Sequence, residues 1–251
     1  MKSMKFLFAF IIVGLIFYGV NNCSGNDDKC PGVPAKTERT LMKIYNGTND
    51  TVLGYITLGT TEGCLQNVLD IPFIKDTVQG QRGLQGWFVL NPKDSTCTYA
   101  PELLGYNGVI SFEFAPNNCP DPVYPNGINQ FEFILNNSYQ GTNAQESINI
   151  SCVHGANCII RCDAITENPF NAGPTYTNVQ GFSNRLNKNA IGLVGVYPYG
   201  CDTCTGSKTP PSCIPLPQPA QKTSICQVQR NAAFNGGLIK VVYLGKEQPL
   251  K

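Results

Sequence analysis

The segment Gln130-Phe-Glu-Phe-Ile-Leu135 sets the fold class of this chain. Side chains of a β-strand point to alternate faces, so a strict two-residue alternation indicates a strand with one buried face. One face of this segment is wholly apolar and consists of Phe131, Phe133 and Leu135. Residues 109–115 repeat the pattern, with three apolar side chains facing one way and Ser111 and Glu113 the other. Both segments are predicted to be strands that cover one core.

Similar short segments recur, joined by stretches rich in Gly, Asn and Pro; they cover residues 40–45, 51–58, 86–90, 147–153, 190–197 and 238–244. The first two flank the turn-forming residues 46–50, which predicts a hairpin. No long segment beyond the N-terminus has the 3.6-residue period of a helix. We therefore expect an all-β protein, a disulfide-rich two-sheet β-sandwich of the jelly-roll kind. Residues 25–251 should form one domain, with a Cys- and Pro-rich excursion at about 198–226.

The N-terminus has the pattern of an export signal. Lys2 and Lys5 precede an apolar run over residues 6–20, and polar residues follow directly. The run is short for a membrane span, which needs about 20 apolar residues. We expect residues 1–24 to be removed and the protein to be secreted, extracellular and free of the membrane. The formal net charge of +1 gives no field that would gather nucleic acid.

The cysteine content agrees with export. Of the 12 cysteines, Cys23 lies in the expected signal. The other 11 are the predicted disulfide cysteines, with one thiol left over, because thiols oxidise in the secretory pathway. They are Cys30, Cys64, Cys97, Cys119, Cys152, Cys158, Cys162, Cys201, Cys204, Cys213 and Cys226. Short separations such as Cys158–Cys162 and Cys201–Cys204 suggest stapled loops. The last four cysteines have a spacing that a zinc ribbon could use, but export favours disulfides, and we expect no metal or cofactor.

Four Asn-x-Ser/Thr sequons follow the expected signal, at Asn46, Asn49, Asn136 and Asn149. The first three stand beside Gly, Asn or Asp and are predicted to lie in exposed turns that carry glycans. Asn149 lies inside an apolar alternation, where burial would hinder its modification.

Several of these segments resemble motifs of thaumatin-like proteins. The resemblance covers about residues 41–157 and the last strand, and its motifs are Leu41-Met-Lys-Ile-Tyr-Asn-Gly-Thr48, Thr51-Val-Leu-Gly-Tyr-Ile56, Gly86-Trp-Phe-Val-Leu-Asn-Pro92, Gly108-Val-Ile-Ser-Phe-Glu113, Gln130-Phe-Glu-Phe-Ile-Leu-Asn136, Asn149-Ile-Ser-Cys-Val-His-Gly-Ala-Asn157 and Ile239-Lys-Val-Val-Tyr243. The resemblance implies a jelly-roll sandwich with a surface cleft, which in that family is acidic and associated with β-glucan binding and antifungal defence. Residues 158–235 have no clear counterpart.

The cleft pattern of the family is only partly kept. Glu132 keeps the strand glutamate of the family, whereas Glu113 falls where the family has an arginine. Asn149 and His154 replace two aspartates, and Asp202 is a guess for the remaining one. The resemblance thus implies a mixed rather than an acidic site.

Glu113 and Glu132 are the candidate carboxylate pair. If their strands are neighbours, both acids could share a groove, and glycoside hydrolysis needs two carboxyl groups about 5–9.5 Å apart. The simpler interpretation is two solvent-facing strand residues. His154 could serve a nucleophilic serine, although a single hydrogen bond in a turn is the simpler role.

Aromatic side chains give a further candidate surface. Tyr197, Tyr199 and Trp87 could stack on sugar rings, but the hydrophobic setting of Trp87 favours a core position.

Three functions follow from these features. The first is a defence or cell-wall glycoprotein that binds extracellular polysaccharide in a groove without catalysis, as a monomer. The second is a β-glucanase-like hydrolase that uses Glu113 and Glu132. The third is a secreted structural or protein-interaction module.

Overall fold

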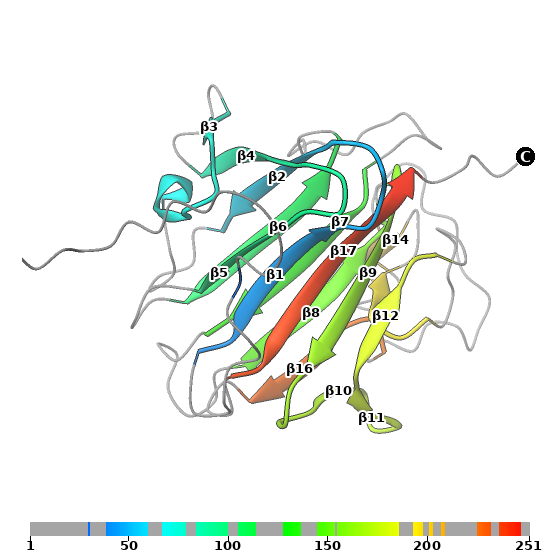
Figure 1. The fold of residues 1–251 in the computed structure, drawn as a ribbon. Coiled ribbons are helices and arrows are strands. Elements are labelled where there is room, and N and C mark those ends of the chain that lie inside the picture. The colour runs from blue at the N-terminus through cyan, green and yellow to red at the C-terminus, as the bar shows by residue number, and fades with distance from the viewer. Residues whose placement is uncertain are drawn as a thin grey trace, which may run out of the picture.

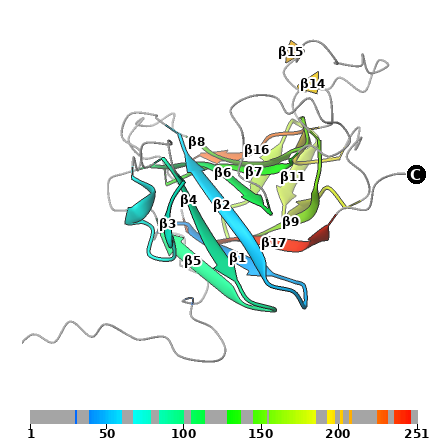
Figure 2. The same cartoon turned by 90° about the horizontal axis from the view of Figure 1, so that it is seen from above.

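The protein is a sandwich of two β-sheets that face each other across one core (Figures 1 and 2). The computed structural model describes residues 30, 39–59, 67–78, 84–99, 105–113, 128–136, 145–153, 155–185, 193–197, 225–231 and 236–246, and the backbone of 201–202 and 207–208. The all-β, two-sheet fold expected from the sequence is confirmed. The expected signal, residues 1–24, lies outside the described residues, and so does most of the excursion at 198–226.

The smaller sheet has five strands in the order β12-β9-β17-β1-β5. Their bounds are β12 Gly181–Ser183, β9 Cys158–Ile165, β17 Leu238–Lys246, β1 Leu41–Asn46 and β5 Ser95–Tyr99. Strands β1 and β17 pair in parallel, so the first and last strands lie side by side at the centre of this sheet (Figure 1). Cys30, which precedes β1 in the chain, forms a disulfide with Cys97 of β5. This disulfide links Cys30 to the edge strand of the smaller sheet.

The larger sheet has ten strands, nine of them in the order β11-β10-β16-β8-β7-β6-β2-β4-β3. Their bounds are β11 Tyr176–Val179, β10 Phe170–Ala172, β16 Val228–Asn231, β8 Gln145–Ser151, β7 Gln130–Leu135, β6 Tyr106–Phe112, β2 Val52–Leu58, β4 Gln85–Leu90 and β3 Asp76–Thr77. The tenth strand, β13 (Val196–Tyr197), pairs with β8. A 3-10 turn, η1 (Val68–Asp70), precedes β3, and β14 (Cys201–Asp202) pairs with β15 (Ser207–Lys208) in a separate ribbon.

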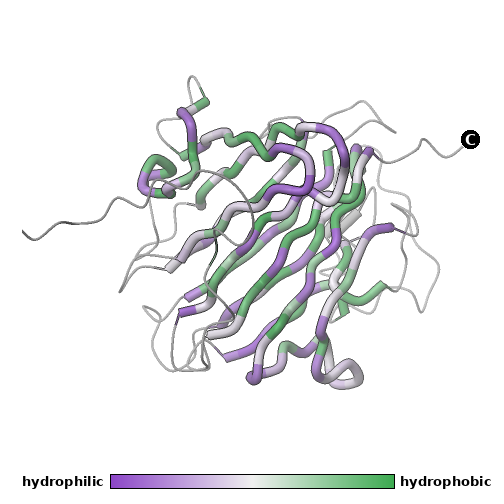
Figure 3. The backbone as a smooth tube through the Cα atoms, in the orientation of Figure 1, coloured by the Kyte–Doolittle hydropathy of each residue, from purple (hydrophilic) through white to green (hydrophobic). Residues whose placement is uncertain are grey.

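Hydrophobic and hydrophilic residues alternate along strands of both sheets (Figure 3). The inward-facing apolar side chains form one core. Phe131, Phe133 and Leu135 are at most 2% exposed, as the alternation predicts. They face Ile239 and Val241 of β17 within one cluster of buried side chains. The polar residues of β7 consequently point to the outer face of the larger sheet, and this face holds the candidate site.

The predicted hairpin between the first two strands is wrong. Strand β1 pairs with β17 and β5, whereas β2 pairs with β4 and β6, so the turn between them crosses from one sheet to the other. Asn46 explains the crossing: its side-chain nitrogen donates to the backbone oxygens of Leu90 and Asn91, at the end of β4. The sequence pattern of a turn is the same for either connection, because it reports local geometry and not strand partners.

The stapled loop predicted for Cys158 and Cys162 is also wrong. Both cysteines lie on β9, four residues apart, which is about 13 Å in an extended strand and too far for a disulfide. Both side chains are buried in the core, and Cys162 is a thiol whose pKa is raised well above its ordinary value by burial and then by the Asp163 carboxylate. Cys162 thus acts as a small apolar side chain, whereas the Cys158 thiol donates a hydrogen bond to Oδ1 of Asn129 at 3.3 Å. Cys226 is disulfide-bonded.

A buried ion pair lies within the larger sheet and is hydrogen-bonded to residues that flank strands of the smaller sheet. Nε of Arg230 on β16 donates to Oε2 of Glu146 on β8 at 2.7 Å, and the two side chains are 2% and 0% exposed. Thr40, just before β1, donates its hydroxyl to Glu146 Oε1 at 2.8 Å, and the Asn136 backbone N–H donates to the same oxygen at 2.6 Å. The other two guanidinium nitrogens donate to the hydroxyls of Thr166 and Thr40 and to backbone oxygens. We call Thr40, Asn136, Glu146 and Arg230 the buried cluster.

Two predicted sequon positions differ from the expectation of exposed turns. Asn46 is fully buried, and Asn136 is 3% exposed and belongs to the buried cluster. Asn149 is buried on β8, and Asn49 is exposed. Within the described part of the chain, no helix is long and apolar enough to cross a membrane.

Candidate functional site

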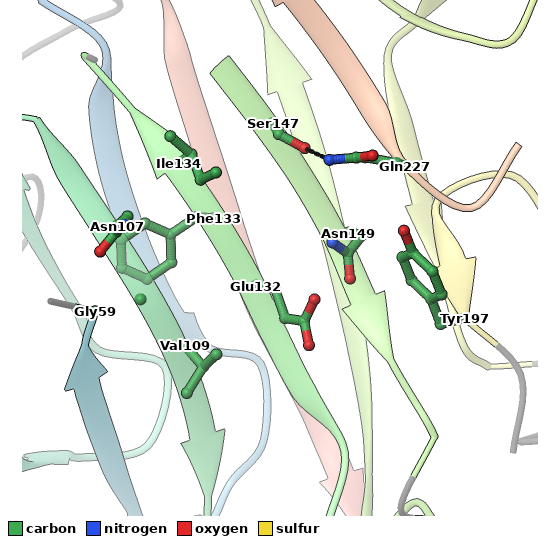
Figure 4. Close-up of a pocket in the computed structure, with 11 residues that line it drawn as sticks. Gly59, Asn107, Val109, Glu132, Phe133, Ile134, Ser147, Asn149, Tyr197 and Gln227 are labelled. Carbon is green, nitrogen blue, oxygen red and sulfur yellow. Dashed lines mark hydrogen bonds between the residues drawn. The ribbon is translucent and has the colours of Figure 1, made fainter. Parts of the chain in front are cut away.

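A groove crosses the outer face of the larger sheet over strands β6, β7 and β8 (Figure 4). It encloses about 310 Å³ and is lined by Gly59, Asn107, Gly108, Val109, Glu132, Phe133, Ile134, Ser147, Asn149, Tyr197 and Gln227. Three of the residues singled out in the sequence, Glu132, Asn149 and Tyr197, therefore come together. The alternation of β7 and β8 explains this, because it sends Glu132 and Asn149 away from the core.

Glu132 and Asn149 form the centre of the groove. They are direct partners in the β7–β8 register, and Val109 of β6 is the partner of Glu132 on its other side (Figure 4). Asn149 is 6% exposed, and its Oδ1 has no hydrogen-bond partner. Leaving a buried acceptor unsatisfied costs about 1–3 kcal/mol. This oxygen is thus an acceptor that the described residues leave without a partner.

Polar side chains that both donate and accept surround this centre. Nε2 of Gln227 donates to the Ser147 hydroxyl at 2.8 Å, and Tyr197 stands beside Asn149 from the short strand β13 (Figure 4). Val109 and Ile134 add apolar surface. Among the lining residues that the structure describes, Glu132 is the one charged side chain. The groove therefore suits a neutral ligand with several hydroxyl groups and apolar patches between them.

Glu113 does not line the groove with Glu132. It follows the last residue of β6 with a φ of 70°, so the alternation breaks there. Its Oε1 accepts a hydrogen bond of 3.2 Å from the hydroxyl of Tyr243, which lies on β17 in the other sheet. Burial, and then the Glu113 carboxylate, raise the pKa of Tyr243 well above its ordinary value. The predicted carboxylate pair in one groove is therefore wrong, because a left-handed residue at the strand end turns Glu113 toward the second sheet.

A second hollow lies on the same face of the larger sheet, over β2, β3 and β4. It encloses about 390 Å³ and is lined by Leu53, Tyr55, Thr77, Val78 and Trp87. Tyr55 and Trp87 are direct cross-strand partners, and both are partly exposed. The expectation that Trp87 belongs to the core is wrong: Gly86 and Phe88, its neighbours on β4, are the residues that point inward. We call Tyr55 and Trp87 the aromatic pair.

Other predicted site residues lie outside what the structure describes. These include His154, Tyr199, Cys204 and Cys213, whereas Cys201 is described by its backbone alone. Asp202 is described by its backbone alone. Among the residues that are described, no cluster of three or more His, Cys, Asp or Glu side chains is placed to hold a metal ion.

Sequence reasoning missed Ser147, Gln227 and Asn107 as lining residues. Ser147 could have been predicted, because it lies two residues from Asn149 on β8 and therefore points to the same face. Asn107 could have been placed in the same way, because it shares the outer face of β6 with Ser111. Gln227 reaches the groove through the pairing of β16 with β8, which no local pattern shows.

The comparison with known proteins yields structural neighbours alone. No family model and no curated protein matches the sequence. Similar solved structures include the thaumatin-like xylanase inhibitor TLXI, with a TM-score of 0.37, 11% identity and coverage of 81% of this chain and 98% of that one. Another is the protein elicitor MoHrip2 from Magnaporthe oryzae, with a TM-score of 0.33, 8% identity and the same coverage of 81% and 98%. The resemblance to thaumatin-like proteins stays a prediction made from the sequence motifs. Neither likeness bears on what the groove binds.

Proposed function

We propose that this chain is a secreted glycoprotein of defence or cell-wall type that binds a β-glucan-like polysaccharide in the groove without cleaving it. The observation that carries the proposal is the Glu132–Asn149 centre, where a carboxylate lies opposite a buried amide oxygen that has no donor. Sugar hydroxyls supply such donors. A hydrogen bond to an ionised acceptor contributes about 1.5–3 kcal/mol, so a few of them suffice for weak and selective binding.

The aromatic pair supports binding of a chain rather than a single sugar. Tyr55 lies two strands from Glu132 across β6, and the registers offset the two by two residues, which together span about 12 Å. Aromatic faces pack against the apolar faces of pyranose rings. A polysaccharide that fills the groove would reach the aromatic pair by extending across the same face of the sheet.

Binding to insoluble polysaccharide tests the proposal. We expect the protein to be retained on insoluble β-glucan and Glu132→Gln to lower the retention by about tenfold to a hundredfold, the equivalent of one charge-assisted hydrogen bond. The matched control is Glu167→Gln, which removes an exposed carboxylate from the turn after β9. Equal retention of the parent and Glu132→Gln would exclude the groove as the binding site. Stronger retention on a cationic glucosamine polymer would reassign the ligand to an amine-bearing chain.

The β-glucanase-like alternative lacks its second carboxylate in the groove, because Glu113 accepts a hydrogen bond from Tyr243 of the other sheet. Its test is the release of reducing ends from soluble β-glucan. Release by the parent that Glu132→Gln abolishes would establish hydrolysis in place of binding.

The protein-interaction alternative is tested with the same protein. Absence of retention on any polysaccharide, together with capture of one protein in a one-to-one ratio from extracellular fluid, would favour it over both glycan functions.

A further inference from the structure

We propose that Asn49 is the asparagine among the four predicted acceptors that carries an N-linked glycan, whereas Asn46, three residues earlier, stays unmodified because it fastens the β1–β2 connection. The inference rests on the proposed secretion and is independent of glycan binding in the groove. Transfer forms a bond between Nδ2 of Asn49 and the anomeric carbon of a lipid-diphosphate-linked oligosaccharide. The bond from that carbon to the diphosphate breaks, Nδ2 loses one proton, and the lipid diphosphate leaves.

The Asn46 side chain is engaged at both of its polar atoms. Nδ2, the atom that a glycan would modify, donates to the backbone oxygens of Asp50 at 2.7 Å, Asn91 at 3.0 Å and Leu90 at 3.2 Å. Oδ1 accepts from the backbone N–H and the hydroxyl of Thr48, at 3.0 and 2.7 Å. Asn46 is also 0% exposed. A sugar on Nδ2 would remove one of two donor hydrogens and has no room, so the modified chain could not close this connection.

Asn136 is excluded for a similar reason. It is 3% exposed, and its amide forms a pair of hydrogen bonds with the backbone of Thr40, from Nδ2 to the oxygen at 3.1 Å and from the N–H to Oδ1 at 2.6 Å. These bonds place the residue before β1 against the end of β7. A glycan on Asn136 would separate the two sheets at the buried cluster.

Asn149 is excluded by its place in the middle of β8. The strand is paired with β7 on one side and β16 on the other, and the side chain is 6% exposed. A glycan on Asn149 would fill the groove and displace Tyr197, which lies beside Asn149 (Figure 4).

Asn49 has the opposite surroundings. It stands at the tip of the β1–β2 connection with Asp50 and Thr51, and all three residues are exposed. Thr51 supplies the hydroxyl of the sequon, so both residues that the transfer needs are open to solvent. The tip lies at the start of β2, and Gly59 at the opposite end lines the groove, about 23 Å along the strand. A glycan on Asn49 therefore leaves the groove free.

The experiment is site mapping on the full chain recovered from the medium of a eukaryotic secretory host. Peptide sequencing by mass spectrometry should find one glycan among the four sequons, on Asn49. Thr51→Ala should remove it, the matched variant Thr51→Ser should keep it, and Thr51→Ala should retain the fold and polysaccharide binding of the parent. A glycan on Asn46, Asn136 or Asn149 of the folded protein, or a secreted chain with Asn49 bare, would overturn the inference.

Failure of secretion is a separate outcome. If the full chain stays inside the cell, the proposed secretion is wrong. A variant in which a host export signal replaces residues 1–24 would then bring the remaining chain into the secretory pathway. The same mapping on that protein then decides the acceptor: Asn49 modified supports the inference, and Asn49 bare contradicts it.

Discussion

Strand β8 contributes one polar residue to the buried cluster and another to the groove, and the two residues differ in their hydrogen bonding. Glu146 points to the core and belongs to the buried cluster, where both of its carboxylate oxygens and all three nitrogens of Arg230 have partners. Asn149, three residues further on, points to the outer face, and its Oδ1 has none. Both residues are almost completely buried. Burial alone therefore does not separate a polar residue that serves the fold from one that we propose to bind a ligand.

The difference lies in what folding leaves unsatisfied. The buried cluster satisfies its charges when the two sheets meet, so its hydrogen bonds serve the fold. At the groove, Oδ1 of Asn149 has no protein partner among the described residues, so this atom does not tie the side chain into the fold. Variants of the two regions should thus act on different quantities.

The largest expected effect is on stability. Arg230→Met leaves Glu146 as an uncompensated buried charge, which typically costs about 3–5 kcal/mol. Denaturant unfolding measures this loss. The control is Arg161→Met: Arg161 pairs with Asp163 on the surface, with 44% of its side chain exposed, and such pairs contribute at most about 1 kcal/mol. An equal loss in both variants would contradict the structural role of the buried cluster.

The next effect separates binding from stability. Asn149→Leu removes the unsatisfied oxygen at similar volume, so we expect stability to be kept or raised by up to about 1 kcal/mol and polysaccharide retention to fall about tenfold. Asn136→Leu is the counterpart, since it should lower stability without changing binding per folded molecule. A fall in stability for Asn149→Leu would mean that this residue, too, serves the fold.

A smaller effect is expected at the aromatic pair. Trp87→Ala should weaken retention on long β-glucan by about twofold to tenfold, the range of about 0.5–1.5 kcal/mol for an aromatic contact. Short oligosaccharides that fill the groove alone should bind as before. Val89→Ala, which truncates an exposed residue of the same strand, is the control. Equal loss for short and long ligands would mean that Trp87 acts by shaping the groove.

The smallest effect is on the pH dependence of stability. The pKa of Tyr243 is raised in the folded protein by burial and by Glu113, so the fold binds the phenolic proton more tightly than the unfolded chain does. Stability from this group is complete below the ordinary value of 10.0 and is lost as the pH rises above it.

Unfolding measured between pH 9 and 12 should therefore show a shallower decline for Tyr243→Phe than for the parent. The decline that remains is expected from Tyr106, Cys162 and Tyr55, whose pKa values burial also raises. Identical slopes would show that Tyr243 is not held protonated by its surroundings.

Much of the fold followed from alternation, although some of it was overlooked. The face assignments of Phe131, Phe133 and Glu132 are confirmed, as are most strands between residues 40 and 151. Strand β9 was missed because its inward positions include Cys158 and Cys162, which were interpreted as crosslinks. The burial of Glu146 could also have been predicted. It lies on the same face of β8 as Ile148 and Ile150, and a charged residue on an apolar face indicates a buried ion pair.

The candidate site was only half predictable. The alternation along β7 and β8 predicted that Glu132 and Asn149 lie on the outer face. It did not predict the direction of Glu113, because the alternation does not reveal a positive φ at the end of a strand. The sequon asparagines behaved likewise, since the same Asn-x-Thr pattern stands at the exposed Asn49 and at the buried Asn46.

The sequence by itself determined which side chains face inward, because the period of a strand is a local property of the backbone. It thereby determined an all-β protein with a polar outer face around Glu132. Only the tertiary structure decided that β1 and β2 belong to different sheets, that Glu113 turns to Tyr243, and that Asn149 keeps an oxygen without a donor. These outcomes depend on contacts between residues far apart in the chain, which are chosen by packing and hydrogen bonding of the whole and which no short pattern contains.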